Sequence, residues 1–438
     1  MATVAGEASE ELAPADDSIA KDADTTLAAP SGGGPPARGS ALSAFQSRPF
    51  ALFWSTIVLS LTGVWVRITA QGWLVYDLTE DSFLLGLASF FNAAPVLIFS
   101  PVAGAVLDRV DRRRVLLGVQ LVTCTMMLLL ATLVVTDVVR VWHIMAIAVV
   151  VGSASAFDWP ARLSLVPTLV SRHQLQSAVA LNAAAFNASR IVGPVVGGVL
   201  IGTVGVGLCF FLNAALYVPF VLVLATLSLD RALPAATHAT SAFSNLVDGY
   251  RYIWRTPTIR GLLSIDIIPL AFGISYITLA PAVAREELDL GGRGLGALLA
   301  ANGAGSLAGT MLVALLSGMR RRGLIVIAGI ACFGVGVVVF GLSGNVYLSM
   351  ALMLCLGMVA AFYGTMNDTL IQTNVDDGYR GRVLAVYSMF WGLTPIGSLE
   401  AGFLANQLGV GTALVINGML VLCYVPILLR FTPVRRIE

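Results

Sequence analysis

The sequence predicts an all-α integral membrane protein with twelve transmembrane helices in two pseudo-symmetric six-helix halves. Of its 438 residues, 57% are hydrophobic and only 12% are charged, and the mean hydropathy is +0.85. Such a composition is not typical of a soluble globular protein. The apolar residues form runs of about 20 residues, the length at which a helix crosses a bilayer, and the second half of the chain repeats features of the first.

The apolar runs define twelve spans, separated by short polar turns. From Phe50 onwards each run is long enough to cross the hydrocarbon core as one helix. The predicted spans are residues 50–76, 83–107, 115–136, 141–160, 178–203, 207–229, 261–283, 294–317, 323–343, 346–368, 383–405 and 410–430.

The distribution of arginine predicts the orientation of these spans. Lys21 is the only lysine, and with the amino terminus inside, the outer loops hold only Arg140, Arg285 and Arg293. This excess of basic residues on one side predicts that both termini lie in the cytoplasm. The inner segments and flanks hold Arg48, Arg109, Arg112–Arg114, Arg162, Arg172, Arg231, Arg251, Arg255, Arg260, Arg320–Arg322, Arg380, Arg382, Arg430, Arg435 and Arg436.

The segments outside the spans suggest a simple domain organisation. Residues 1–44 are acidic and rich in Ala, Gly, Pro and Ser, which predicts a disordered cytoplasmic tail without a signal peptide. Residues 45–229 and 261–430 form the two halves. The linker at 230–260 contains apolar residues at helical spacing, which predicts an amphipathic helix on the inner membrane surface. Residues 431–438 form a second cytoplasmic tail.

The two halves share short features at an offset of roughly 205–210 residues. Internal repeats of this kind are common in transporters. Leu85-Gly86 and Asn92 return as Leu295-Gly296 and Asn302, and Gly205-Val206-Gly207 and Asn213 return as Gly409-Val410-Gly411 and Asn417.

A dense group of charges lies between the second and third spans. It follows the pattern Gly-x-x-x-Asp-Arg-x-(Gly/Asp)-Arg-(Arg/Lys), and its residues are Gly104, Asp108, Arg109, Asp111, Arg112 and Arg113. Glycine permits close helix approach, and an aspartate can pair with an arginine or with a helix amino terminus. We expect a cytoplasmic latch between the halves. An ordinary basic turn would explain the arginines but not the ordered Gly/Asp/Arg pattern, which the second half lacks.

The fifth span contains a second pattern, Gly-Pro-x-x-Gly-Gly, preceded by an arginine. Its residues are Arg190, Gly193, Pro194, Gly197 and Gly198. The proline removes one helical hydrogen bond and bends the helix, and the glycines present small faces for tight helix packing. A glycine-rich packing helix of any function is the alternative interpretation.

These two patterns resemble signatures of the major facilitator superfamily, the second being the one that marks its antiporters. Further residues resemble the bacterial branch that includes enterobactin exporters and macrolide pumps, across nearly all of residues 45–430: Pro160-Ala161-Arg162, Pro167, Leu169-Val170, Asn182, Asn187 and Arg380-Gly381-Arg382-Val383. The resemblance implies export of a drug-like organic compound or siderophore by proton antiport and alternating access. One departure is that the fourth span, as predicted, lacks the buried arginine that many drug/proton antiporters carry, so no proton relay is expected there.

Ionisable and polar residues inside the spans are the remaining candidates for substrate or proton binding. A charge at mid-bilayer costs about 2.5–3.5 kcal/mol, so it normally faces a cavity or a partner. We expect protonation of a buried carboxylate to be coupled to export, with buried structural pairing as the alternative. The candidates are Arg67, Gln71, Asn182, Asn187, Arg190, Asp266 and Glu400.

Several classes of function are excluded or disfavoured. The five cysteines stand singly in apolar runs, so neither metal nor disulfide sites are expected. No GxxxxGK[ST] motif is present for ATP, and the three histidines are far apart, which disfavours a membrane enzyme. We expect no cofactor or nucleic-acid partner. The expected partners of a monomer are a small-molecule substrate, protons and the bilayer, with an uptake permease as the alternative function.

Overall fold

The computed structural model describes residues 42–107, 109–227, 242–316 and 321–436. The chain divides into Met1–Ser40 and Ala41–Glu438. Some residues of the sequence predictions lie outside the described residues. They are the predicted amino-terminal tail up to residue 41, Asp108, residues 230–241 of the linker, Arg320 and the last two residues.

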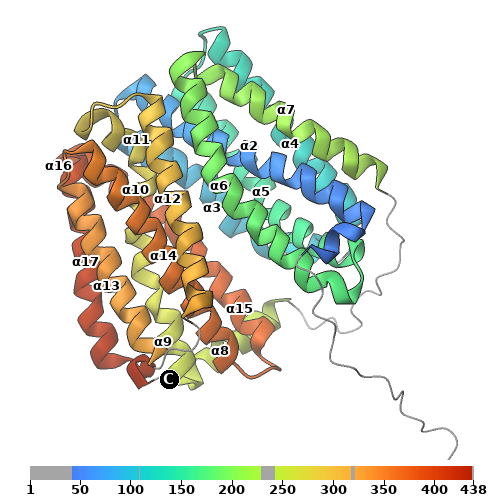
Figure 1. The fold of residues 1–438 in the computed structure, drawn as a ribbon, viewed down its shortest axis with the longest axis vertical. Helices are drawn as coiled ribbons and strands as arrows, with labels where there is room; N and C mark the ends of the chain where they lie inside the picture. Colours follow the sequence, from blue (N-terminus) through green and yellow to red (C-terminus); the bar gives the residue numbers. More distant parts are fainter. Residues whose placement is uncertain (1–41, 108, 228–241, 317–320, 437–438) are drawn as a thin grey trace, which may run out of the picture. The chain divides into compact units, whose positions relative to one another are not determined.

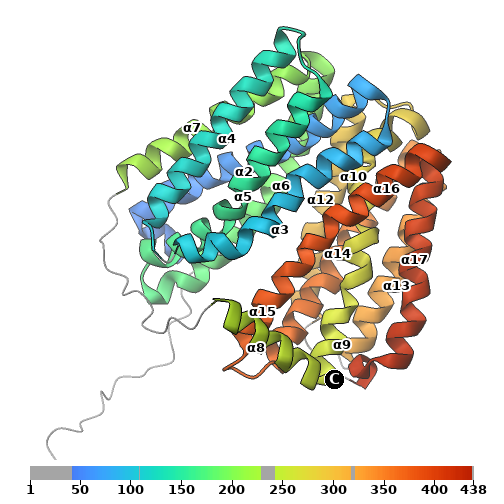
Figure 2. The ribbon, with the colours of Figure 1, turned by 180° about the vertical axis from the view of Figure 1, so that it is seen from behind.

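The first half consists of six long helices, α2 to α7 (Figures 1 and 2). Their apolar side chains suit lipid, and helices satisfy their own backbone hydrogen bonds, as a bilayer requires. Side-chain caps mark two of the starts: Ser47 accepts from the backbone N–H of Phe50 at 3.4 Å, and Asp111 from that of Arg113 at 2.9 Å. The helices are α2 (Arg48–Thr79), α3 (Ser82–Leu107), α4 (Arg112–Val135), α5 (Val141–Leu169), α6 (Leu175–Thr203) and α7 (Val206–Thr226).

The second half follows α8 (Ala242–Arg255), which covers part of the linker. Its first span is interrupted by two wider turns, Pro269–Gly273 and Val283–Glu287. The elements are α9 (Pro257–Ile265), α10 (Ser275–Thr278), α11 (Ala280–Ala282), α12 (Gly292–Leu315), α13 (Arg322–Gly341), α14 (Val346–Asn374), α15 (Arg380–Ser388), α16 (Thr394–Leu408) and α17 (Val410–Phe431).

By length and composition, eleven spans in the described residues can cross a membrane. The remaining predicted span, residues 383–405, is divided into α15 and α16 by a tighter turn at Met389–Leu393. Pro395 stands in the first turn of α16, where its missing N–H leaves no helical bond to the preceding segment. The division therefore interrupts a twelfth span rather than removing it.

The fourth span differs from its prediction at its carboxyl end. The run was expected to end at residue 160, but α5 continues through Pro160 and Pro167 to Leu169. The helix thus contains Arg162, which is 2% exposed and pairs with Asp158 at 2.7 Å. The expectation that this span carries no buried arginine is wrong, because an ion pair one helical turn apart lets the helix carry charge past the apolar run.

Glycines with left-handed backbone geometry occupy equivalent turns in the two halves. Gly205 precedes α7 with φ of 93°, and Gly409 precedes α17 with φ of 89°. Side chains other than hydrogen disfavour this region of backbone space. The repeated glycines in the sequence therefore serve the same two helix reversals.

The halves touch through two close helix crossings. Helix α6 packs beside α12 (Figure 1), and α3 packs beside α16 (Figure 2). A Cβ atom added to Gly296 of α12 would lie 2.8 Å from the Cα atom of Gly198 in α6, and one added to Gly86 of α3 would lie 3.2 Å from the Cα atom of Gly402 in α16. Because Gly86 and Gly296 are repeat equivalents, the two crossings are related by the pseudo-symmetry.

We predict that Gly296→Ala destabilises the protein by about 1–3 kcal/mol, the usual cost of overpacking. The new methyl group would lie 2.5 Å from the carbonyl oxygen of Pro194, and backbone cannot move aside as a flexible side chain can. The measurement is thermal unfolding of the purified protein in detergent. Gly118→Ala is the matched control, because nothing lies within 4 Å of its added Cβ; equal unfolding temperatures for both variants would contradict the prediction.

Candidate functional site

The two ends of the helical bundle differ. We call the end with the turns at residues 109–111, 170–174 and 375–379 the basic end, and the opposite end the far end. A cavity of about 790 Å³ lies between α3, α5 and α15 in the half of the protein nearer the basic end. Its wall includes Trp159, Arg382 and Ser388 and reaches Gly104 and Gly378, both of which are exposed. The cavity is therefore open at the basic end. Its volume lies within the usual range for small-molecule sites.

Aromatic rings connect the cavity wall to a mid-membrane arginine. Trp159 is 48% exposed, and its ring centroid lies 5.8 Å from that of Phe186. Phe186 in turn lies 6.1 Å from Trp65, and the guanidinium of Arg190 lies 5.6 Å from the Trp65 ring. Phe186 and Arg190 are four residues apart and share one face of α6.

Two asparagines of the sequence repeat hold equivalent polar networks. In the first half, Arg67 donates through Nη1 to Asn92 at 3.2 Å and to Gln71 at 2.9 Å. In the second half, Asn302 donates to the Tyr276 hydroxyl at 2.7 Å. Asn302 also accepts from Arg190 across the two halves, with Nη2 and Oδ1 3.0 Å apart. Arg67 is buried within its own half, whereas Arg190 joins the halves.

Asp266 stands at the centre of a network in the second half. Asp266 is the residue directly after α9, and it is 3% exposed. Its Oδ2 accepts from the Tyr387 hydroxyl at 2.6 Å and from Nδ2 of Asn367 at 2.7 Å. The network therefore joins the seventh, tenth and eleventh spans. Tyr387 immediately precedes Ser388, which lines the cavity.

Glu400 lies in α16, farther from the cavity, and is partly buried. With the Asn417 amide oriented so that its oxygen accepts from Ser275, its nitrogen donates to both carboxylate oxygens of Glu400 at 3.2 Å. No residue of this group is part of the cavity wall described above. Glu400 is thus held by α17 rather than by the elements around the cavity.

The charged turn after α3 makes its described side-chain contacts within the first half. Asp111 caps α4 and lies 3.8 Å from Arg114, while Arg113 donates to the Leu224 carbonyl and, at 2.5 Å, to that of Ala225 at the end of α7. Arg109 is exposed, Arg112 is partly buried, and Asp108 lies outside the described residues. No described side chain of this turn bonds the second half.

The glycine pattern of α6 packs two neighbouring helices. A Cβ atom at Gly193 would lie 2.4 Å from that of Trp65, and one at Gly197 would lie 3.3 Å from that of Thr69, both in α2. Gly198 faces α12 instead. Asn182 and Asn187 do not join this contact: Asn187 donates to a carbonyl of its own helix at 2.9 Å, and Oδ1 of Asn182 is buried without a described partner.

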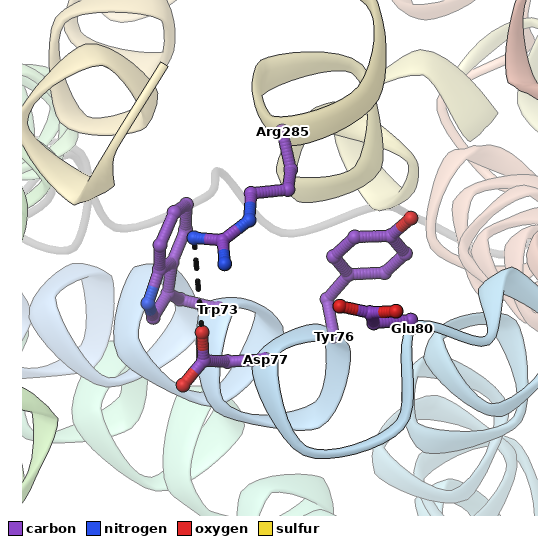
Figure 3. Close-up of a pocket in the computed structure, with 5 residues that line it drawn as sticks. All are labelled: Trp73, Tyr76, Asp77, Glu80 and Arg285. Atoms are coloured by element: carbon purple, nitrogen blue, oxygen red, sulfur yellow. Dashed lines mark ion pairs between the residues drawn. The ribbon is translucent and has the colours of Figure 1, made fainter. Parts of the chain in front are cut away.

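At the far end, side chains from both halves come together around a small pocket (Figure 3). Arg285 extends from the end of the seventh span over the ring of Trp73, 5.6 Å from its centroid. It pairs with Asp77 at 3.9 Å, and the Tyr76 hydroxyl donates to Glu286. The space enclosed by these side chains is only about 10 Å³, enough for about one water molecule.

Sequence reasoning missed several of these residues. Asn302 and Asn417 were visible as repeat markers, but not as partners of Arg190 and Glu400. Phe186 and Tyr387 carried no signal, since single aromatic residues in apolar runs usually pack. Arg285 was assigned to an outer loop, yet it lies within the span Pro257–Glu287.

Comparison with known proteins supports a transporter. The chain is 24% identical to the staphyloferrin A transporter of Staphylococcus aureus, with 85% of this chain and 93% of the relative covered. It is 26% identical to the multidrug efflux pump Tap of Mycolicibacterium fortuitum, with 83% and 90% covered. It is 24% identical to the enterobactin exporter EntS of Shigella boydii, with 89% and 93% covered.

Solved structures share the fold at lower identity. The nucleoside transporter NupG superposes with a TM-score of 0.67 at 13% identity, covering 88% of this chain and 100% of that one. A bacterial homologue of the lysosomal transporter Spinster gives a TM-score of 0.67 at 12% identity, covering 89% and 96%. The family model described as transmembrane secretion effector matches residues 39–438. The chain therefore belongs to the transmembrane secretion effector family of the major facilitator superfamily, and it is a multi-pass membrane transporter rather than an enzyme.

Proposed function

We propose that this protein exports an amphipathic organic compound or siderophore by proton antiport and alternating access. The functions of two of the relatives, multidrug efflux and enterobactin export, favour export over uptake. The basic end faces the cytoplasm in this proposal, as arginine placement predicts. Substrate enters the open cavity from that side and leaves at the far end after the halves have rocked about the mid-membrane site.

The observation that carries alternating access is the unequal state of the two ends. At the basic end a cavity of about 790 Å³ is open between the halves, whereas at the far end Arg285 of the second half lies over Trp73 and pairs with Asp77 of the first half. The cavity at the basic end is large enough for a substrate-sized molecule, whereas the pocket beside Arg285 has room for about one water molecule. With the basic end in the cytoplasm, as proposed here, this arrangement corresponds to an inward-open state, and the opposite state would require the far-end contacts to separate.

The far-end ion pair makes a small contribution to this closure. The Asp77 and Arg285 side chains are 49% and 50% exposed, and such solvent-exposed pairs contribute about 0.2–1 kcal/mol. The buried glycine crossings make the stronger contact. The pair therefore tunes the balance between the two states rather than locking the closed end.

We predict that Asp77→Arg shifts the protein towards opening of the far end. Two facing arginines would repel one another, and about 1 kcal/mol changes the ratio of the two states about fivefold. The measurement is the distance distribution between spin labels at Thr203 and Leu408, in a background with the native cysteines replaced. The double variant Asp77→Arg with Arg285→Asp restores the ion pair with reversed charges and should restore the label distance of the wild type. If the distance distribution is unchanged in both variants, the ion pair does not contribute to closure of the far end.

Asp266 is the favoured proton carrier of the two carboxylates. Its hydrogen bonds join three spans of the second half, and one of their donors, Tyr387, is next to Ser388 of the cavity wall. Glu400 is held by Asn417 on the neighbouring helix, away from the cavity wall. A carboxylate that changes from a desolvated to a hydrated site can bind and release a proton during the cycle.

Export is tested by the accumulation of candidate compounds in cells with and without the protein, each with and without a proton-motive force. We expect lower accumulation only in cells that have both the protein and a proton-motive force. In proteoliposomes, Asp266→Asn should reduce substrate-driven proton release at least about tenfold, because the amide cannot titrate, while Glu400→Gln has the smaller effect.

Asp137→Asn is the matched control for the loss of a carboxylate. Asp137 lies in a far-end turn with φ of 60°, a conformation that asparagine also tolerates. Equal accumulation under all four conditions would refute export of those compounds. Unimpaired proton release in both Asp266→Asn and Glu400→Gln would refute coupling through these carboxylates.

We further propose that the charged turn of residues 104–113 latches the halves when the cavity closes. In the open state its described contacts stay within the first half, so the latch would form only in the other state. Asp108→Asn should impair transport while membrane insertion remains normal. Asp111→Asn should be milder, since asparagine caps a helix nearly as well. Normal transport by Asp108→Asn would refute the latch.

A further inference from the structure

Besides the ion pairs Arg162–Asp158 and Arg285–Asp77, charges of opposite sign lie within spans of the two halves. In the first half, Arg67 and Arg190 lie within spans, and in the second half Asp266 and Glu400 do. No ion pair within the described residues joins these four side chains. Because a charge at mid-bilayer costs about 2.5–3.5 kcal/mol, each of the four needs neutral polar contacts, a proton or an external counter-charge.

Arg162 shows how this chain stabilises a buried arginine with a counter-charge of its own. Its guanidinium pairs with Asp158 at 2.7 Å and donates to Ser60 at 2.9 Å. A carboxylate one turn away thus neutralises the charge within the same helix. Arg190 has no such partner in the described part of the chain, where its side-chain hydrogen bond is the one to the neutral amide of Asn302.

The guanidinium of Arg190 also keeps accessible donors. An arginine has five N–H groups arranged as a planar fork, and only Nη2 donates to Asn302. Nε of Arg67 is fully buried without a partner, whereas no nitrogen of Arg190 belongs to that group of buried, unpaired atoms. Arg190 is partly exposed, so the remaining part of its fork can bind a ligand.

The surroundings of Arg190 suit an aromatic or otherwise apolar ligand body. The aromatic series Trp159, Phe186 and Trp65 leads from the cavity wall to the guanidinium, with successive ring centroids 5.8 and 6.1 Å apart. The guanidinium lies over the Trp65 ring, 5.6 Å from its centroid, and a guanidinium binds carboxylate or phosphate groups through two parallel hydrogen bonds.

We propose that Arg190 and the aromatic residues Trp65, Phe186 and Trp159 form a binding site for an amphipathic anion. The apolar body of the substrate would lie along the rings, and its carboxylate, sulfonate or phosphate group would pair with the free edge of Arg190. This inference rests on the proposed export function and names its substrate class. It also assigns separate tasks to the halves, anion binding to the first and proton binding to the second.

Two probes that differ by one charge test the site directly. Dansylglycine carries a carboxylate, and its primary amide has the same ring system without the charge. The full-length protein is reconstituted in phosphatidylcholine nanodiscs, and binding is measured by energy transfer from tryptophan to dansyl after subtraction of empty nanodiscs. We expect the wild type to bind dansylglycine about tenfold more tightly than the amide, as for one charge-assisted hydrogen bond.

Variants of Arg190 then assign the preference to this side chain. Arg190→Gln should abolish the preference for the anion while leaving amide binding within about twofold. Arg190→Lys should keep only part of the preference, since the charge remains but the planar fork with its two parallel hydrogen bonds is lost. Arg255→Gln is the matched control, because it removes one exposed arginine from α8, outside the site. It should behave as the wild type.

Three outcomes would overturn the proposal. A wild type without preference for dansylglycine contradicts it, and so does an Arg190→Gln variant that keeps the preference. If Arg190→Gln weakens the binding of both probes equally, the side chain shapes the site through its hydrogen bond to Asn302 and does not bind the charge. Since the assay measures binding without transport, a positive result would stand even if the export test failed.

Discussion

The close approach of backbone to backbone at two glycine crossings is the constraint on which the rest of this structure depends. Lipid tails are as apolar as leucine, so helices in a bilayer associate through tight packing rather than through exclusion of water. Where α6 crosses α12 and α3 crosses α16, glycines of the two halves face one another so closely that no Cβ atom would fit without a shift. These crossings close the far end, and the cavity lies where the helices diverge beyond them.

Within that frame, the polar residues of the spans have distinct environments. Arg162 and Asp158 form an ion pair inside α5, so neither charge needs a ligand to neutralise it. Arg190 and Asp266 instead have neutral partners, Asn302 in one case and Asn367 with Tyr387 in the other. A charge held by neutral groups can exchange its counter-ion or its proton at lower cost than one in a buried pair. This difference separates the candidates for transport from the structural charges.

Prediction from the sequence succeeded where the signal was local. Apolar runs located the spans to within a few residues at most ends, because hydropathy and length alone decide whether a segment suits a bilayer. It failed at α5, where Arg162 and two prolines mark a polar end to the run although the helix continues to Leu169. Tertiary partners outside the run stabilise that extension, among them Ser60 in α2.

The candidate site was only partly predictable, for the same reason. Arg190, Arg67, Asp266 and Glu400 stood out because charge inside a span is expensive, and the repeat marked Asn302. Phe186 and Tyr387 carried no such mark. Their importance depends on neighbours far away in the sequence, as the sequence separation of 121 between Asp266 and Tyr387 illustrates.

The sequence by itself determined that this is an integral membrane protein, the order of its spans, the two-fold repeat and the superfamily. Each of these follows from composition, periodicity or short contiguous motifs. Only the tertiary structure decided which glycines meet, which end of the protein is open, and which buried charge lacks a counter-charge. Arg190 and Asn302 are 112 residues apart, and no local pattern specifies that pairing. It exists because the pseudo-symmetric halves pack with α6 against α12, which places the arginine of one half beside the asparagine of the other.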